Sequence, residues 1–112
     1  MVKLILLFRT PDDVAAFEAR WSRDFVPLLD RIPGLRRVAV SRTLQALSGE
    51  VDLYLTHELF FDDLLAAREA LATPEGQAAG RALMGFAAGI VTLCLAHHLE
   101  DLLPGPDDEA GA

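Results

Sequence analysis

Hydrophobic residues between Thr10 and Gly34 recur at intervals of three and four positions, which is the spacing of one face of an α-helix. Thr10 can cap this helix, Pro11 suits its first position, and Asp13 completes a pattern typical of a helix start. Pro33 and Gly34 are expected to end it. The expected apolar stripe consists of Val14, Phe17, Trp21, Phe25, Leu28 and Ile32. The pattern therefore predicts one amphipathic helix from Thr10 to Gly34.

Four other segments have the pattern of β-strands. Residues 2–9 are a continuous apolar run, which suits a central strand buried on both faces. Residues 35–47 mix arginines with apolar positions, as an edge strand does, and a turn signal after them predicts a hairpin. Residues 51–61 alternate in polarity, so one face of this strand is expected to be buried, with His57 on it. Residues 90–99 form the last expected strand.

Two further helices are expected between the last two strands. Asp62 and Asp63 stand where a helix begins, and the helix dipole accounts for both carboxylates without any role in acid-base chemistry. This helix is expected to run to about Ala72. Thr73 and Pro74 then begin another helix, which is rich in glycine and alanine and is expected to run to about residue 88.

The order strand, helix, strand, strand, helix, strand predicts an α+β fold of the ferredoxin-like βαββαβ type. Its antiparallel sheet carries the helices on one face. Alternate residues of the first strand point to opposite faces of the sheet, and both sets are apolar. A second copy of the chain is the simplest cover for the face without helices. We therefore expect a homodimer formed through the sheet face.

Composition limits the classes of function. The 112 residues suit a single domain over residues 1–100, followed by an acidic, disordered tail over residues 101–112. A formal net charge of −7 argues against nucleic acid as a partner. The apolar runs are too short for a membrane span or a signal peptide, so we expect a cytoplasmic protein. The single cysteine, Cys94, lies in an apolar run and is expected to be an inert core thiol.

Several short motifs along the chain resemble those of a known family. They are Phe8-Arg9-Thr10-Pro11-Asp12, Ile32-Pro33-Gly34-Leu35, Glu58-Leu59-Phe60-Phe61 and Thr73-Pro74-Glu75-Gly76-Gln77-Ala78, together with Phe17, Trp21 and Pro27-Leu28. With these residues the chain resembles the EthD-like family of the dimeric α+β barrel superfamily. The resemblance implies a dimeric α+β barrel. It leaves the reaction open, because relatives include cofactor-independent monooxygenases, lactone isomerases, cyclases and haem enzymes.

The same resemblance singles out Phe25. Family members commonly carry an aromatic residue, a histidine four positions later and a proline two positions after that. Here the three positions are Trp21, Phe25 and Pro27, so phenylalanine replaces the family's histidine. The proton chemistry of that histidine cannot be carried over to this chain.

His57 and His97 are the polar exceptions on two otherwise apolar strand faces. If both faces look at the helices, these histidines could share a cleft with Trp21 and with Asp24 or Tyr54. A neutral imidazole there could act as a general base, with His57 as the first candidate and His97 as the second. The alternative is that each histidine is a structural residue with one hydrogen bond.

The other candidate residues have competing interpretations. Phe25 and Trp21 could bind an apolar ligand or simply form the core. Tyr54 alternates away from His57, so it could instead lie at the dimer interface. We expect no metal site, because His57 and His97 would bind a metal only if the strands brought them together with a carboxylate. The arginines at 36, 37 and 42 suit a solvated strand edge, with an anion contact as the alternative.

Two functional hypotheses follow. The first is a small homodimer that binds a small apolar or aromatic molecule and transforms it without an organic cofactor. The second is a non-catalytic ligand-binding or structural dimer that has lost the family's histidine, which Phe25 favours. A haem protein would need His57 or His97 as its axial ligand.

Overall fold

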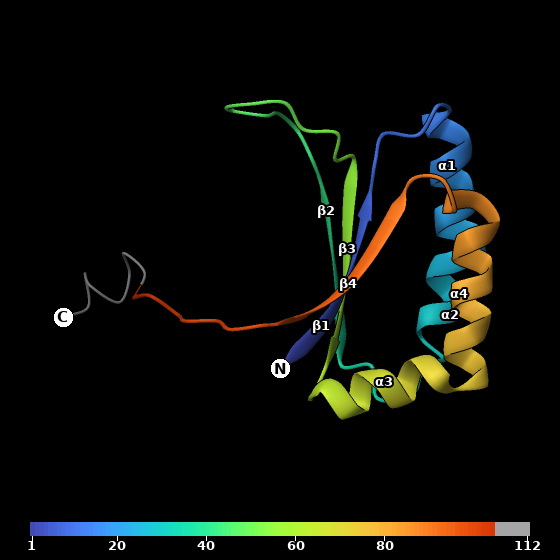
Figure 1. Ribbon diagram of the computed structural model, residues 1–112, viewed down its shortest axis with the longest axis vertical. Helices are drawn as coiled ribbons and strands as arrows, with labels where there is room; N and C mark the ends of the chain where they lie inside the picture. The colour runs from blue at the N-terminus through green and yellow to red at the C-terminus, as the bar shows by residue number, and fades with distance from the viewer. Residues whose placement is uncertain (105–112) are drawn as a thin grey trace.

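The computed structural model describes residues 1–104, which fold around one antiparallel sheet of four strands in the order β2-β3-β1-β4 (Figure 1). The strands are β1 (Val2–Phe8), β2 (Arg37–Arg42), β3 (Leu55–Phe61) and β4 (Val91–His97). The long apolar run is a central strand, and the arginine-bearing segment is an edge strand, as the sequence predicts. The predicted α+β architecture is confirmed.

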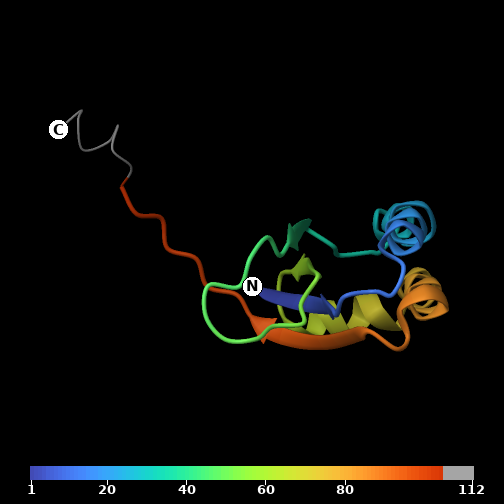
Figure 2. The same cartoon turned by 90° about the horizontal axis from the view of Figure 1, so that it is seen from above.

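All long helices lie on one side of this sheet. The elements are α1 (Val14–Arg20), the π-helical segment η1 (Trp21–Phe25), α2 (Val26–Leu29), α3 (Leu64–Ala72) and α4 (Pro74–Ala87). Seen from above, α1 and α4 lie side by side against the sheet (Figure 2). The helix α3 crosses one end of the sheet (Figure 1). The core fills the space between the sheet and this helix layer.

The first helix begins three residues later than the sequence pattern predicts. Asp13, not Thr10, caps it, because the Asp13 carboxylate accepts a hydrogen bond from the Ala16 backbone N–H at 3.0 Å. The Thr10 backbone N–H instead donates to the Asp52 carboxylate at 2.9 Å. Thr10 therefore ties the chain to the loop before β3 and takes no part in the helix.

The same helix contains a π-helical turn that the periodicity did not reveal. The backbone N–H of Val26 donates to the carbonyl of Trp21, which is five residues earlier. This turn adds one residue to the helix and shifts the apolar stripe after Phe25. As a result Leu29 is buried and Leu28 is only half-buried, which corrects the predicted stripe. Val14, the first predicted member, is 41% exposed.

The two later helices begin where the sequence predicts. Asp63 accepts from the Ala66 backbone N–H at 2.8 Å, and Thr73 accepts from the Gly76 backbone N–H at 3.1 Å. Gly76 lies at the close junction of α3 with α4. A Cβ atom at this position would lie 2.2 Å from the carbonyl oxygen of Ala70, so only glycine fits.

The two faces of the sheet differ in how well this chain covers them. Alternate residues of β1, from Val2 to Phe8, face the helices and are buried. Ile5 and Leu7 face the other way and are half-buried. Cys94 pairs with Ile5 and is exposed on this open face, so the prediction of a core thiol is wrong for the isolated chain.

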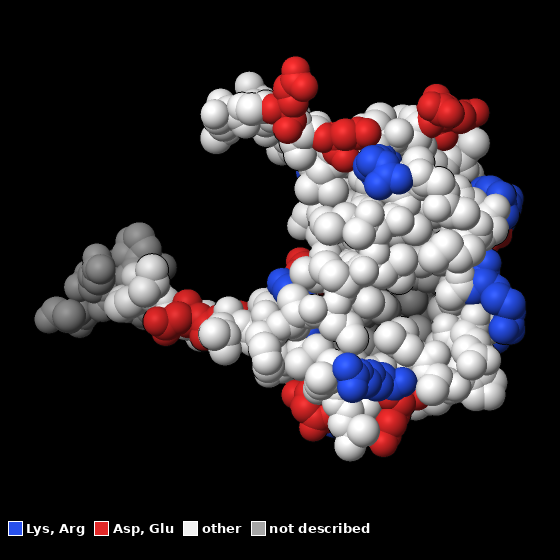
Figure 3. Space-filling view, viewed as in Figure 1, with Lys and Arg blue, Asp and Glu red and all other residues white. Residues whose placement is uncertain are grey.

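Two segments extend beyond the open face of the sheet. They are the β2–β3 loop, residues 43–54, and residues 98–104 after β4 (Figure 1). The space-filling view shows a hollow between them (Figure 3). The predicted disordered tail falls largely on residues 105–112, which lie outside the described part of the chain. No helix within residues 1–104 is long and apolar enough to cross a membrane.

Candidate functional site

His57 is the buried polar side chain of the helix-facing core within residues 1–104, with only 1% of its surface exposed. It lies in the middle of β3, paired with Leu6 on one side and with Val40 on the other. The alternation of β3 directs it toward the helices together with Leu55 and Leu59. The sequence prediction of a polar residue on a buried apolar face is therefore confirmed for this position.

Trp21 supplies the hydrogen-bond partner of this histidine. Its indole N–H donates to Nδ1 of His57 across 3.3 Å, and the two rings meet edge to face with centroids 5.5 Å apart. An Nδ1 atom that accepts a hydrogen bond carries no proton, so the proton of the neutral ring is on Nε2. The contact with Trp21 thus selects one tautomer of His57.

Phe25 contacts the same imidazole from the next turn of the helix. Its ring centroid lies 5.8 Å from that of His57, with an interplanar angle of 89°. The π-helical turn from Trp21 to Phe25 holds both aromatic residues at the helix surface that faces the histidine. Such turns are often found at functional sites. Spacings of three and four residues could not reveal this turn, because they fit a regular helix equally well.

Burial determines the charge of His57. Desolvation in this apolar setting lowers the pKa of His57 from 6.5 to about 4. The ring is therefore neutral at neutral pH. With Nδ1 engaged by Trp21, a neutral His57 can donate from Nε2 to an oxygen atom, and it is a weak base.

Arg42 packs on the outer side of Trp21, a contact that the sequence did not indicate. Its guanidinium lies 5.2 Å from the centroid of the indole ring, within cation-π range. Glu18 holds the guanidinium through contacts of 2.9 Å to Nε and 2.7 Å to Nη2. The sequence predicted Arg42 as part of a charged strand edge, with an anion contact as the alternative, and did not indicate a contact with Trp21. Trp21 therefore lies between a fixed cation and the buried histidine.

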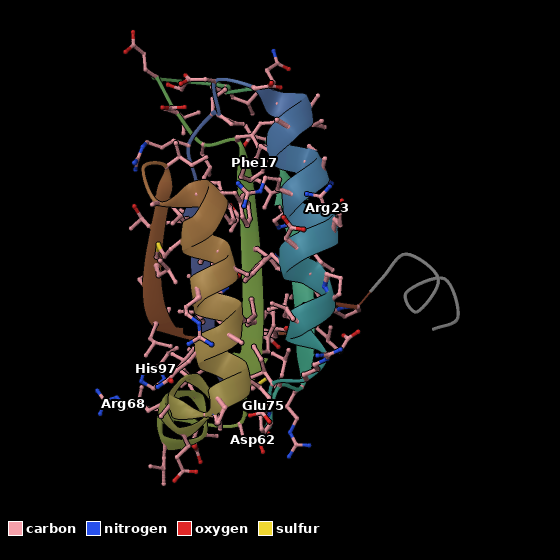
Figure 4. The ribbon with its side chains drawn as sticks, turned by 90° about the vertical axis from the view of Figure 1, so that its right-hand side faces the viewer. Phe17, Arg23, Asp62, Arg68, Glu75 and His97 are labelled. Atoms are coloured by element: carbon pink, nitrogen blue, oxygen red, sulfur yellow. The ribbon has the colours of Figure 1, made fainter. Side chains whose placement is uncertain are left out.

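Two predicted ligand-binding residues lie away from this pair. Asp24 is on the outer side of the helix, where its carboxylate accepts from Arg23 at 2.8 Å and from Arg20 at 3.3 Å. Both hydrogen bonds lower the pKa of Asp24, and the one from Arg23 has the larger effect. Figure 4 shows Arg23 at the surface of the helix layer. Asp24 is thus engaged in surface ion pairs.

Tyr54 lies on the helix side of the sheet. Its ring meets that of Phe17 edge to face at 5.7 Å, and the residue is half-buried. The alternative that placed Tyr54 at a dimer interface is therefore wrong. It was based on strict alternation in the strand, but β3 begins only at Leu55, so Tyr54 is not bound by that alternation.

His97 is also on the helix side, but at the far end of an edge strand. It pairs with Val2, whereas His57 is level with Leu93. Two strand spacings across the sheet and four residues along it separate the two histidines by about 17 Å. His97 is exposed and lies at the lower end of the sheet in Figure 4. The structure therefore does not bring His97 into a cleft with His57.

An apolar cavity of about 50 Å³ lies near the histidine, which is not one of its lining residues. It lies between the sheet and the helices α2 and α4, and its lining residues are apolar throughout, among them Leu6, Phe25, Leu29, Leu83 and Leu93. Leu6 and Phe25 are also direct neighbours of His57. The cavity and the histidine therefore share a wall.

A second hollow, an open groove of about 290 Å³, lies between the start of α1 and the end of α4. Phe17, Arg20 and Phe86 contribute to its lining. The ring of Phe86 packs against Phe17 at 5.5 Å and against Phe25 at 6.3 Å. Phe86 therefore stands between this outer groove and the wall of the inner cavity.

Comparisons with known proteins concern the chain as a whole. No family model matches the sequence. An uncharacterised 11.0 kDa protein from the thcB-thcC intergenic region of Rhodococcus erythropolis is 32% identical over 104 residues, which cover 93% of this chain and 100% of that protein.

Solved structures give the same fold. SnoaB of Streptomyces nogalater, a cofactor-independent oxygenase, matches with a TM-score of 0.63 and 23% identity over 90% of this chain and 95% of SnoaB. A dimeric ferredoxin-like protein of unknown function from Jannaschia matches with a TM-score of 0.66 and 15% identity over 88% of this chain and 100% of that one.

An EthD family protein from Bacillus halodurans is more similar. It has a TM-score of 0.84 and 37% identity over 88% of this chain and 99% of its own length. The similarity therefore extends over nearly the whole length of both chains. This chain belongs to the EthD family.

Proposed function

We propose that the protein is a homodimer that binds a small apolar molecule between its sheet and its helix layer, with His57 as the polar group that the molecule meets. One observation carries the proposal: the buried polar side chain found within residues 1–104, His57, contacts two residues, Leu6 and Phe25, that line an entirely apolar cavity. An apolar pocket with very few polar groups is the usual composition of a small-molecule site.

The cavity is too small to admit a ring-sized ligand without movement of a side chain. A cavity that holds benzene has a volume of about 150 Å³, whereas this one has about 50 Å³. A ring-sized ligand must therefore displace a side chain. Phe86 is the best candidate, because it is half-buried and stands between the outer groove and Phe25. Rotation of Phe86 would join the groove to the cavity.

The role of His57 follows from its tautomer. The ring presents Nε2–H as a donor while Trp21 occupies Nδ1. A donor in an apolar site favours a ligand with a carbonyl or hydroxyl oxygen, because such a bond is stronger where water is excluded. In a reaction without an organic cofactor, the same donor would polarise a carbonyl group.

A non-catalytic binding protein is the second candidate function. Phe25 stands where family members commonly have a histidine, and it contributes only an apolar edge to the site. The low pKa of His57 also makes this ring a poor proton acceptor at neutral pH. Both observations favour binding over proton transfer.

The homodimer is supported by the open face of the sheet. Ile5, Leu7 and Cys94 lie on this face without a covering layer from residues 1–104. The face also carries the ion pair of Lys3 with Glu58, and its apolar residues are of the kind that another layer usually covers. Three structural neighbours are described as dimeric proteins.

A matched pair of probes tests the binding proposal. Acetophenone has a carbonyl oxygen where cumene has a methyl group, and the two molecules are otherwise similar in shape. We expect acetophenone to bind more tightly in a titration followed by NMR and to shift the Nε2–H signal of His57. In His57→Phe the preference for acetophenone should disappear. If neither probe binds, the proposed pocket is contradicted. If the wild-type protein binds both probes equally tightly, the role of His57 is contradicted.

A further inference from the structure

Two apolar arms leave the sheet on its open side. We define the loop arm as residues 43–54 and the tail arm as residues 98–104; both extend away from the helix layer (Figures 1 and 2). Leu44 and Leu47 of the loop arm are 98% and 92% exposed. The leucines of the tail arm are 83% to 91% exposed: Leu99, Leu102 and Leu103. Such leucines indicate a surface that is covered in the assembled protein.

The base of the loop arm is fixed to the sheet. The Tyr54 backbone N–H donates to the Phe8 carbonyl at 2.8 Å, and the Thr43 backbone N–H donates to the Tyr54 carbonyl at 3.1 Å. Asp52 accepts from the Thr10 backbone N–H at 2.9 Å. These bonds set the direction in which the loop arm leaves the molecule.

The base of the tail arm is fixed by a separate cluster on the open face. His98 donates its backbone N–H to Met1 at 2.9 Å, and its ring meets that of Phe60 edge to face at 4.7 Å. Glu100 forms an ion pair with Arg37 of the opposite edge strand, and the Arg37 guanidinium lies 4.1 Å from the Phe60 ring centroid. The tail arm therefore crosses the end of the sheet before it extends outward.

The reach of both arms exceeds the spacing between packed sheets. Two sheets pack face to face at about 10 Å. Beyond their fixed bases, the four residues 101–104 span up to about 14 Å, and half of the eight residues 44–51 spans up to about 14 Å. If a second copy packs on the open face, the arms are long enough to reach the edges of its sheet.

The sheet edges offer apolar residues that the helix layer leaves uncovered. Val38 and Val40 on β2 are 47% and 40% exposed, and Leu93 and Leu95 on β4 are 40% and 38% exposed. All four point to the helix side of the sheet. Leu93 also lines the inner cavity. Apolar arms and apolar edges therefore occur on the same molecule, as a self-complementary contact requires.

We propose that the arms of each copy reach around the partner's sheet and pack their leucines on its edge residues, so that the partner's arm completes the wall of the cavity beside Leu93. This inference rests on the proposed homodimer and goes beyond it, because a sheet-to-sheet dimer could form without the arms. By two-fold symmetry each copy gives and receives the same contacts.

Charge substitutions test the contribution of the arms to the dimer. Leu47→Asp and Leu102→Asp each place a carboxylate at a position that is over 90% exposed in one chain, so the folded monomer should tolerate both. Leu65→Asp on α3, where the leucine is 65% exposed, is the matched control. We expect each arm variant to raise the dimer dissociation constant at least tenfold in sedimentation velocity, and the control to leave it unchanged.

A cross-linking experiment tests where the arms lie. Benzoylphenylalanine at position 102, in an equal mixture of ¹⁴N- and ¹⁵N-labelled protein, distinguishes links between copies from links within one copy. We expect links between copies to peptides that contain Val38 and Val40 or Leu93 and Leu95. A dimer with unchanged affinity in the arm variants and links only within one copy would overturn the arms while leaving the dimer intact. A wild-type monomer would overturn the dimer itself, and the arms with it.

Discussion

The indole N–H of Trp21 donates to Nδ1 of His57 across 3.3 Å inside the core. This bond satisfies a polar ring in an apolar setting and fixes its tautomer. It also links the first helix to the centre of the sheet, since Trp21 begins the π-helical turn and His57 is in the middle of β3. The contact thus serves both the stability of the fold and the chemistry of the candidate site.

The depressed pKa of His57 predicts a pH-dependent stability. The unfolded chain binds a proton at His57 near pH 6.5, whereas the folded chain binds it only near pH 4. Between these values the unfolded state holds more protons, so the free energy of unfolding should fall as the pH decreases from about 6.5 toward 4. The expected loss is about 3 kcal/mol, measured by urea denaturation at several pH values.

The control for this prediction is His57→Phe, which keeps an aromatic ring in the core and removes the titrating group. Carboxylates also titrate at the acid end of this range, so the difference between the two pH profiles is the relevant quantity. If the variant and the wild type lose stability in parallel between pH 6.5 and 4.5, His57 is not held neutral in the folded protein.

Trp21→Phe should release the tautomer of His57. The variant lacks the indole N–H, so Nδ1 is left without its donor and the ring can carry its proton on either nitrogen. ¹⁵N NMR of the imidazole should change from one tautomer to a mixture. We expect the variant to be destabilised by about 2 to 4 kcal/mol, from the unpaired nitrogen and the smaller side chain. An unchanged ¹⁵N spectrum would show that Trp21 does not select the tautomer.

Arg42 is expected to act on His57 through Trp21. Arg42→Met keeps much of the side-chain volume and removes the charge over the indole ring, which should cost about 1 kcal/mol because the site is partly exposed. The fluorescence of the single tryptophan should shift, and the Trp21 indole N–H signal should broaden. Arg31→Met, at an exposed position, is the control and should change neither signal. A Trp21 signal that is identical in both variants would contradict the role of Arg42.

The fold was largely predictable because its elements have strong local signals. The caps at Asp63 and Thr73 are marked by short polar side chains that satisfy backbone N–H groups, and both helices begin there. The start of α1 was less predictable, because Thr10 and Asp13 are both good caps. A contact 42 residues away, from Thr10 to Asp52, decides between them, and no local pattern contains it.

The candidate site was predictable only in part. His57 could be found because a polar residue on an apolar strand face is unusual, and Trp21 and Phe25 because they belong to the apolar stripe. The separation of His97 from His57 depends on strand order and register, which alternation alone does not give. The contact of Arg42 with Trp21 joins an edge strand to a helix, so it too follows from tertiary structure.

Replacing two glycines of α4 by alanine should change the stability of the protein in opposite directions. A Cβ at Gly76 would lie 2.2 Å from the Ala70 carbonyl oxygen, so Gly76→Ala must push α3 and α4 apart. We expect a loss of stability of more than about 3 kcal/mol, because the clash is with backbone and not with a movable side chain. A Cβ at Gly80 meets no atom within 4 Å. Alanine there should stabilise the protein by about 1 kcal/mol, since alanine is the better helix former. Thermal unfolding of both variants measures the contrast, and a mild effect at Gly76 would mean that the junction of α3 and α4 is looser than the structure shows.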